Sequence, residues 1–279
     1  MNENYLKNLL KKYNLKPNFT YGQNFLIDDG VLDEIVDAAQ INSSNSILEI
    51  GPGIGNLTRR LCDKAGFVLS IEKDPKFQPV LHAIKKDYPK NFRFEIVDAL
   101  GFNFKDFFKE QGVSSYKVVA NIPYYITGKI LDMLMTAKFK PSSVTVLAQK
   151  EVAERVCAAP GDLSVLAISV QIYGRPKFIR AVSKNSFYPA PKVDSAILHI
   201  DLSQPTKYQI TDEKKFFKIV KACFAGKRKQ IHNTLVNNLK LEKNQAISIL
   251  NSIGISPKAR PQELTIGEWV QLSGMIDHD

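Results

Sequence analysis

The sequence has few of the residues that build disulfide frameworks or metal sites. Its three cysteines are widely spaced and form no Cys-x-x-Cys motif: Cys62, Cys157 and Cys223. Its four histidines show no metal-ligand spacing: His82, His199, His232 and His278. We therefore expect core thiols in place of disulfides, and no bound metal ion.

Long apolar runs are absent as well. No run approaches the roughly 18 apolar residues that a membrane-spanning helix needs. The first residues, 1–7, lack the apolar core of a signal peptide. These absences predict a cytoplasmic protein with no membrane partner.

Positive charge, in contrast, is in excess. Lys and Arg number 38 against 28 Asp and Glu, a formal net charge of +10, and the pI is about 9.3. This balance favours a polyanionic partner such as nucleic acid, although it also fits an ordinary solvated surface. With 279 residues, of which 44% are hydrophobic, the chain can form one α/β domain and a smaller second one.

Apolar, strand-like runs alternate with helical patterns in the first part of the chain. We predict strands at 46–51, 67–72, 92–97, 117–121 and 143–148, separated by helices that include 56–65 and 127–137. This alternation predicts an α/β fold with a mostly parallel, doubly wound sheet and right-handed crossovers. Two later runs, 178–182 and 195–202, resemble a strand pair added at the sheet edge.

Beyond Gln204 the pattern becomes helical and basic. Residues 204–279 hold 12 Lys and Arg against 7 Asp and Glu, and we predict a first domain over 1–204 and a small all-helical domain over 205–279. One face of a predicted helix that ends near Gly226 carries Lys214, Lys218 and Lys221. This face and the cluster Lys227-Arg228-Lys229 are either phosphate-contacting surfaces or ordinary solvated ones.

A glycine turn follows the first of these predicted strands. Gly51, Gly53 and Gly55 are spaced G-x-G-x-G, which is one residue shorter than the G-x-G-x-x-G pattern of dinucleotide-binding folds. Glycine lets the backbone approach a ligand that lies across the strand end, and it adopts positive φ at little cost. A plain tight turn is the alternative interpretation.

Two acids favour the ligand-binding interpretation. Glu72 ends the next apolar run, 21 residues after Gly51, which is about the spacing at which an acid meets ribose hydroxyls. Asp98 ends the third run. Both acids are expected at the carboxyl edge of the sheet, where open α/β sheets bind ligands, and together with the turn they predict a nucleotide-like cofactor.

The segment Asn121-Ile122-Pro123-Tyr124 carries the predicted chemistry. The exocyclic amine of adenine attacks poorly while its lone pair is delocalised, and acceptors aimed at its N–H groups favour a more tetrahedral nitrogen. The Asn121 side-chain oxygen and a backbone carbonyl can accept these bonds, and Tyr124 offers a stacking face. With S-adenosylmethionine as methyl donor, in-line placement suffices and no Ser, Cys or His nucleophile is required.

Four segments make the sequence similar to the ribosomal RNA adenine N6-dimethyltransferases, and most similar to their bacterial small-subunit branch. They are Gly22–Leu26, Glu49–Gly55, Asn121–Tyr124 and Phe187–Ser195. The resemblance extends from about residue 20 to the C-terminal helical region. It implies a Rossmann-like class I methyltransferase fold with S-adenosylmethionine as cofactor. The implied substrate is a pair of adjacent adenosines in a hairpin loop near the 3′ end of 16S rRNA, in the small subunit or its precursor.

The resemblance also implies roles for cofactor-binding residues. Asn24 and Leu26 would contact the cofactor from the N-terminal segment, and Gly51 would line its amino-acid end. Glu72 would bind the ribose, and Asp98 the adenine amine.

Further residues would act on the RNA. The resemblance places Asn121 between cofactor and target, and Phe187 on the face of the flipped adenine opposite Tyr124. The segment Phe224–Asn233 matches the basic C-terminal motif of the family and would contact RNA through Lys227, Arg228 and Lys229.

The sequence departs from the family in two places. Pro17–Tyr21 lacks the Lys or Arg that usually precedes the Gly-Gln-Asn motif, so RNA contact there is weaker or comes from Lys7, Lys11, Lys12 and Lys16. The loop at 159–165 is shorter than usual, which affects substrate contacts but not the methyl-transfer site.

Two alternatives to this assignment stay open. The first is a 23S rRNA adenine N6-methyltransferase of the macrolide-resistance type, which shares the cofactor motifs. The second is a ribosome assembly or RNA-binding factor that has kept the fold and lost catalysis. For the protein itself we expect a monomer.

Overall fold

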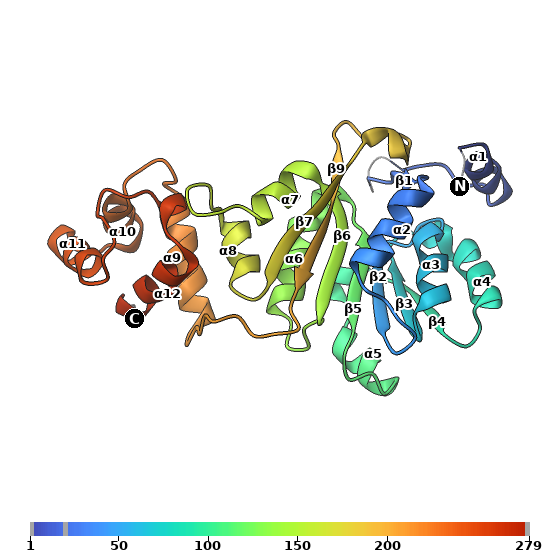
Figure 1. Ribbon diagram of the computed structural model, residues 1–279, viewed down its shortest axis with the longest axis horizontal. Coiled ribbons are helices and arrows are strands. Elements are labelled where there is room, and N and C mark those ends of the chain that lie inside the picture. The colour runs from blue at the N-terminus through green and yellow to red at the C-terminus, as the bar shows by residue number, and fades with distance from the viewer. Residues whose placement is uncertain (1–2, 19–21, 277–279) are drawn as a thin grey trace. The chain divides into compact units, whose positions relative to one another are not determined.

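The computed structural model describes residues 3–18 and 22–276, which form two compact units (Figure 1). The first unit comprises the chain up to Ala153 together with Pro176–Ser203. The second comprises Glu154–Arg175 and the chain from Gln204 onward. In the part of the chain that is described, no helix is long and apolar enough to cross a membrane.

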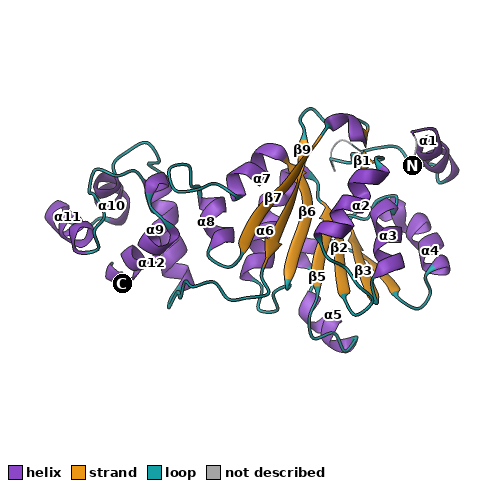
Figure 2. Cartoon of the chain, viewed as in Figure 1, coloured by secondary structure: helices purple, strands orange, loops and turns teal. Residues whose placement is uncertain are grey.

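A seven-stranded sheet forms the centre of the first unit (Figure 2). Its strand order is β4-β3-β2-β5-β6-β9-β7. The strands are β2 (Ser46–Ile50), β3 (Phe67–Glu72), β4 (Phe92–Ile96), β5 (Lys117–Asn121), β6 (Ser143–Gln149), β7 (Arg175–Val182) and β9 (Ser195–Asp201). Six of these strands lie within two residues of their predicted positions, and β7 begins three residues earlier than predicted.

The strand order places a topological switch at the centre of the sheet. Strands β2 to β6 are parallel to one another, and β9 is antiparallel to β6. From β2 the chain adds β3 and then β4 toward one edge of the sheet, and it then returns to add β5 and β6 on the other side of β2. The switch point therefore lies between β2 and β5. Open α/β sheets bind ligands outside the carboxyl ends of the strands at such a point.

Helices cover the two faces of this sheet, and alternate strand residues explain how. Ile47 and Val68 belong to one buried cluster with the apolar side chains of α2, α3 and α4, whereas the neighbouring Leu48 and Leu69 are equally buried and point to the opposite face. The helices of this unit are α1 (Glu3–Lys12), α2 (Asp29–Ala38), α3 (Asn56–Lys64), α4 (Gln78–Asp87), α5 (Phe104–Glu110) and α6 (Thr127–Thr136); α7 (Lys150–Val156) lies at the division between the two units.

A second, two-stranded sheet joins distant parts of the first unit. β1 (Phe25–Leu26) pairs antiparallel with β8 (Phe187–Tyr188), so that Leu26 lies opposite Phe187. Tyr188 precedes a cis proline. The pairing brings the Gly22–Leu26 and Phe187–Ser195 segments together, although they are more than 160 residues apart in the sequence.

The second unit is helical. It contains α8 (Val165–Gln171), α9 (Glu213–Phe224), α10 (Ile231–Leu239), α11 (Lys243–Ser252) and α12 (Ile266–Met275). In α9 the buried side chains are Phe216, Ile219, Val220 and Cys223, and the three lysines predicted to share a face, Lys214, Lys218 and Lys221, are exposed. The helix ends at Phe224, just before Gly226.

The segment 154–175 packs with this helical unit, whereas the sequence interpretation included it in the domain 1–204. Leu163 and Ile168 are fully buried in the same cluster as Phe216 of α9. The short loop before them is fixed to the unit because Gly161 N–H donates to the Gln262 carbonyl (2.9 Å) and the Gln262 amide donates to the Gly161 carbonyl (2.7 Å). Tertiary packing of a segment that is remote in the sequence decides this arrangement.

Candidate active site

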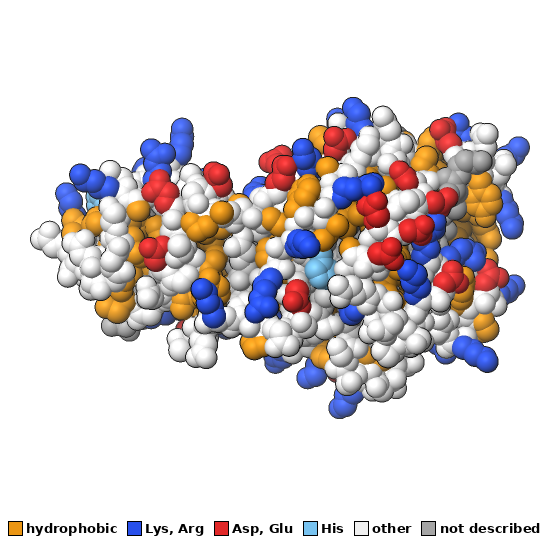
Figure 3. Space-filling view, viewed as in Figure 1, with side chains coloured by type: hydrophobic (Ala, Val, Ile, Leu, Met, Phe, Trp, Pro, Cys, Tyr) orange, Lys and Arg blue, Asp and Glu red, His pale blue; other side chains and the backbone are white. Residues whose placement is uncertain are grey.

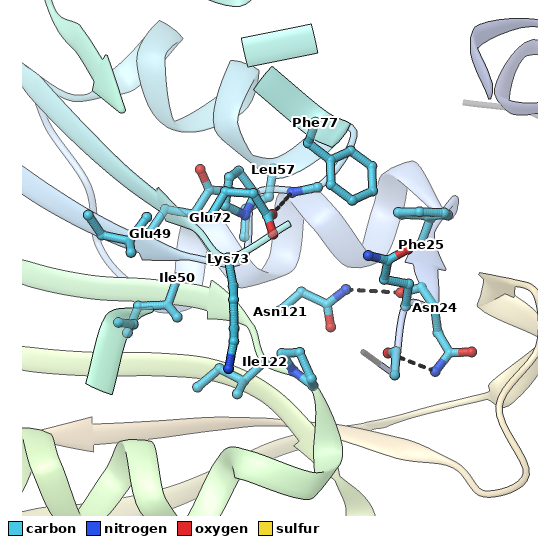
Figure 4. A pocket seen from close by; sticks show the side chains of 18 of the residues that line it. Asn24, Phe25, Glu49, Ile50, Leu57, Glu72, Lys73, Phe77, Asn121 and Ile122 are labelled. Carbon is cyan, nitrogen blue, oxygen red and sulfur yellow. Dashed lines mark hydrogen bonds between the residues drawn. The ribbon is translucent and has the colours of Figure 1, made fainter. Parts of the chain in front are cut away.

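A cavity of about 1100 Å³, counted with its open mouth, lies at the carboxyl ends of the central strands (Figure 4). It is lined from β1, β8 and the segments that follow β2, β3, β4 and β5. All eight residues predicted to bind cofactor or to act in catalysis line this one cavity: Asn24, Leu26, Gly51, Glu72, Asp98, Asn121, Tyr124 and Phe187.

The glycine turn forms one wall. Gly51, Gly53 and Gly55 have φ values of 75°, 53° and 79°, in the left-handed region where side chains are disfavoured. At Gly55, the N-cap residue of α3, an added Cβ would lie 2.1 Å from Cδ1 of Ile84. At Gly51 it would lie 3.7 Å from the carbonyl oxygen of Asn121. The turn thus keeps its backbone open to the cavity.

Glu72 is held rigidly at the end of β3. Its Oε2 accepts the Gly53 N–H (3.1 Å), its Oε1 accepts the Asp74 N–H (2.8 Å), and the residue is 7% exposed. Burial raises the pKa of this carboxyl, and the backbone N–H donors of Asp74, Gly53 and Lys73 oppose that rise. A fixed carboxylate between the glycine turn and β3 can accept hydrogen bonds from a pair of ligand hydroxyls.

Glu49 is a second buried acid, to which sequence reasoning gave no role. Its Oε2 accepts the hydroxyls of Ser70 (2.6 Å) and Thr58 (2.7 Å). Desolvation by burial raises the pKa of Glu49 to about 7, against the two hydroxyl donors. The sequence feature that could have indicated a role for Glu49 is its position in the Glu49–Gly55 motif.

Asp98 lines the cavity just after β4. Its Oδ1 accepts the Leu100 N–H (3.0 Å), and its Oδ2 is 2.7 Å from the Lys73 ammonium. Lys73 lowers the pKa of Asp98. Lys73 itself lines the cavity and was missed from the sequence, because a lysine after a strand-ending acid is an ordinary surface pattern.

Asn121 connects β5 to the N-terminal segment. Its amide N–H donates to the Asn24 carbonyl (3.3 Å), and the Asn24 amide donates to the Gly22 carbonyl (3.3 Å) (Figure 4). Among the described residues, Oδ1 of Asn121 has no hydrogen-bond partner, so it can accept from a bound molecule.

Tyr124 and Phe187 are held by different means. The Tyr124 hydroxyl is 2.6 Å from Oγ of Ser195 in β9, and burial raises its pKa. Phe187 is 4% exposed and fixed in β8 by pairing with Leu26. The Asn56 amide, another contact missed from the sequence, donates to the Leu26 carbonyl (2.9 Å) and ties β1 to the start of α3.

The basic residues predicted to bind RNA lie in the second unit. Lys227, Arg228 and Lys229 are exposed in the turn after α9. On the face drawn in Figure 3, Lys and Arg side chains are spread among Asp and Glu side chains. The predicted weaker RNA contact of segment 17–21, before the Gly-Gln-Asn motif, stays a prediction, since residues 19–21 lie outside the described residues.

The comparison with known protein families decides the identity. The family Ribosomal RNA adenine dimethylase matches residues 14–278. The chain belongs to this family. As a ribosomal RNA adenine dimethylase, it is an S-adenosylmethionine-dependent methyltransferase, and its cavity fits that cofactor because it combines an open glycine turn, two separated carboxylates and apolar walls.

Relatives of this protein match nearly its whole length. It is 40% identical to "Ribosomal RNA small subunit methyltransferase A" of Dehalococcoides mccartyi (strain CBDB1), over 95% of this chain and 90% of that protein. It is also 40% identical to the protein of that name from Clostridium botulinum (strain ATCC 19397 / Type A), over 97% and 98%.

Two solved structures share its fold. A dimethyladenosine transferase from Plasmodium falciparum is 26% identical, with a TM-score of 0.75 over 89% of this chain and 95% of that one. The 23S rRNA methyltransferase ErmE is 26% identical, with a TM-score of 0.71 over 91% and 100%. The predicted class I methyltransferase fold is confirmed.

Proposed function

We propose that the protein transfers methyl groups from S-adenosylmethionine to N6 of two adjacent adenosines in the hairpin loop near the 3′ end of 16S rRNA, in the small subunit or its precursor. The observation that carries the proposal is that one cavity is lined by all eight residues singled out for cofactor and target. The 40% identity to two small-subunit methyltransferases supports the choice of RNA.

The cofactor is proposed to lie along the carboxyl ends of β2, β3 and β4. Glu72 accepts the ribose hydroxyls, Asp98 accepts the adenine amine, and Gly51 lets the amino-acid end approach the backbone. Asn24 and Leu26 close this site from the N-terminal segment. The fixed orientation of Glu72 and Asp98 supports these roles, because neither carboxylate has to reorganise when the cofactor binds.

The target adenine is proposed to enter between Tyr124 and Phe187. Oδ1 of Asn121 and the Ile122 carbonyl then accept hydrogen bonds from the two N6–H groups. These bonds favour a tetrahedral nitrogen with an available lone pair. The bound cofactor would supply a sulfonium methyl group: the lone pair would form the N–C bond as the C–S bond breaks, the neutral thioether S-adenosylhomocysteine would leave, and the methylated amine would release its proton to water. In-line placement is the main catalytic contribution, and a second cycle converts the monomethylated amine to dimethyladenosine.

RNA binding outside the cavity is assigned to the second unit. Lys227, Arg228 and Lys229 are exposed and offer three cations to phosphates. The exposed lysines of α9 extend this basic surface. We propose that a single copy of the chain acts on each subunit.

The test is transfer of labelled methyl from S-adenosylmethionine to small subunits that lack the modification, followed by nucleoside analysis. We expect N6,N6-dimethyladenosine at a neighbouring pair near the 16S 3′ end. Label in 23S rRNA would instead indicate a 23S rRNA methyltransferase, the activity for which the ErmE protein is named. Cofactor binding without transfer to any rRNA would favour a non-catalytic assembly factor.

A further inference from the structure

One aromatic side chain at the cavity mouth has no role in the proposed chemistry. Among the described residues, five large apolar side chains are exposed: Tyr5, Leu100, Tyr125, Val193 and Met275. Of these five, Tyr125 lines the active-site cavity, and it is 56% exposed. An aromatic ring that is open to solvent at the entrance of a binding site can stack on a ligand.

Tyr125 differs from its neighbour Tyr124 in how it is held. The Tyr124 hydroxyl is fixed by Ser195. Among the described residues, none forms a hydrogen bond with the Tyr125 hydroxyl or a ring contact with its side chain. Gly22 lies beside the edge of the ring, where an added Cβ would be 3.4 Å from Cδ1 and 3.6 Å from Cε1. Because residue 22 is glycine, its backbone can lie close to the ring edge.

We propose that Tyr125 stacks on the nucleotide adjacent to the target adenosine, so that it holds the second base of the substrate pair outside the cavity. The inference rests on the proposed function. When one adenine is extruded into the cavity, its neighbour loses a stacking partner. An exposed aromatic one residue from Tyr124 in the chain is placed to replace that partner.

Stacking on an aromatic side chain suits this role. It depends on the π-face that every base carries, and loss of one such contact lowers affinity about five- to 150-fold. A lysine at this position would bind phosphate as a point charge and would not distinguish a stacked base from a missing one. Tyr125 therefore contributes to recognition of unpaired, adjacent bases, whereas the charged second unit contributes affinity.

The first test compares Tyr125→Ala with Tyr125→Phe, using unmodified small subunits as substrate. For Tyr125→Ala we expect KM for the subunit to rise about tenfold, with cofactor affinity by calorimetry unchanged. Tyr125→Phe keeps the ring and should restore the wild-type KM. Tyr5→Ala is the matched control, because Tyr5 is 55% exposed in the same unit but does not line the cavity.

The second test measures binding of a synthetic hairpin with two adjacent adenosines, and of the same hairpin with an abasic site at one of them. We expect the abasic site to weaken binding to the wild type about tenfold and to have little further effect on Tyr125→Ala. Equal losses for both proteins would overturn the stacking role. If the wild type forms dimethyladenosine but Tyr125→Ala has a normal KM, this inference fails and the proposed function stands.

Discussion

At the scale of single residues, the cavity uses its acids in different ways. Glu72 is buried and bound by two backbone N–H groups, Asp98 is half exposed and paired with Lys73, and Glu49 is buried behind the turn with two hydroxyl donors. Only Glu72 and Asp98 were assigned cofactor roles from the sequence. Glu72 and Asp98 could be recognised in the sequence because each ends an apolar, strand-like run. The burial of Glu49 could not, because it results from the packing of the sheet.

Glu72→Ala is expected to weaken S-adenosylmethionine binding about ten- to hundredfold, because hydrogen bonds to a charged group contribute about 1.5–3 kcal/mol. RNA affinity should stay nearly unchanged. Calorimetric titration with the cofactor checks this, and Glu72→Gln, which keeps one acceptor for the backbone, separates a loss of folding from a loss of ribose contact. An unaltered cofactor affinity in Glu72→Ala would remove Glu72 from the ribose role.

Glu49 should make stability depend on pH. Its folded pKa of about 7 exceeds the ordinary value of 4.5, so the folded protein binds the proton more tightly than the unfolded chain does. The resulting stabilisation is complete below pH 4.5 and is lost as the pH rises through 7. One pKa unit corresponds to about 1.4 kcal/mol, so the total is about 3 kcal/mol.

Glu49→Gln removes this titration. In urea unfolding measured from pH 4.5 to 8, the wild type should lose about 3 kcal/mol relative to Glu49→Gln. Parallel stability curves for the two proteins would mean that Glu49 ionises with an ordinary pKa in the folded state.

At the scale of elements, the junction between β2 and α3 requires glycine. Gly55→Ala places a Cβ 2.1 Å from Ile84 Cδ1 in the core and forces φ +79° on a residue with a side chain. Left-handed backbone costs about 1–2 kcal/mol and overpacking about 1–3 kcal/mol. We expect a loss of at least about 2 kcal/mol in the free energy of unfolding.

Gly128→Ala is the matched control for this change. Gly128 lies in the first turn of α6, is exposed, and has no atom within 4 Å of an added Cβ. Alanine there should leave stability unchanged or raise it by up to about 1 kcal/mol. A similar loss in both variants would show that the β2–α3 junction is not specially constrained. Urea unfolding of the three proteins measures the difference.

At the scale of the whole molecule, the residues that line the cavity belong to the sheet-bearing unit, and the basic turn belongs to the helical unit. Changing Lys227, Arg228 and Lys229 together to Ala should weaken RNA binding and reduce the slope of log affinity against log salt by up to about 2 to 3. Cofactor affinity should not change, because none of the three lines the cavity.

The control for the triple variant removes three other exposed cations, Lys86, Lys105 and Lys109, which lie on α4 and α5. It lowers the net charge equally. If both triple variants reduce the salt slope to the same extent, the effect is one of total charge and the turn after α9 is ordinary solvated surface.

Local signals in the sequence predicted the sheet strands, the glycine turn, the strand-ending acids Glu72 and Asp98, and the Asn121–Tyr124 segment. Such signals are recorded in neighbouring residues, whereas Asn24, Leu26 and Phe187 were singled out through the resemblance to the family. Tertiary structure alone decided the β1–β8 pairing, the Lys73–Asp98 ion pair, the burial of Glu49 and the packing of 154–175 with α9. Each of these depends on contacts between segments far apart in the chain, and such contacts leave no periodic mark in the sequence.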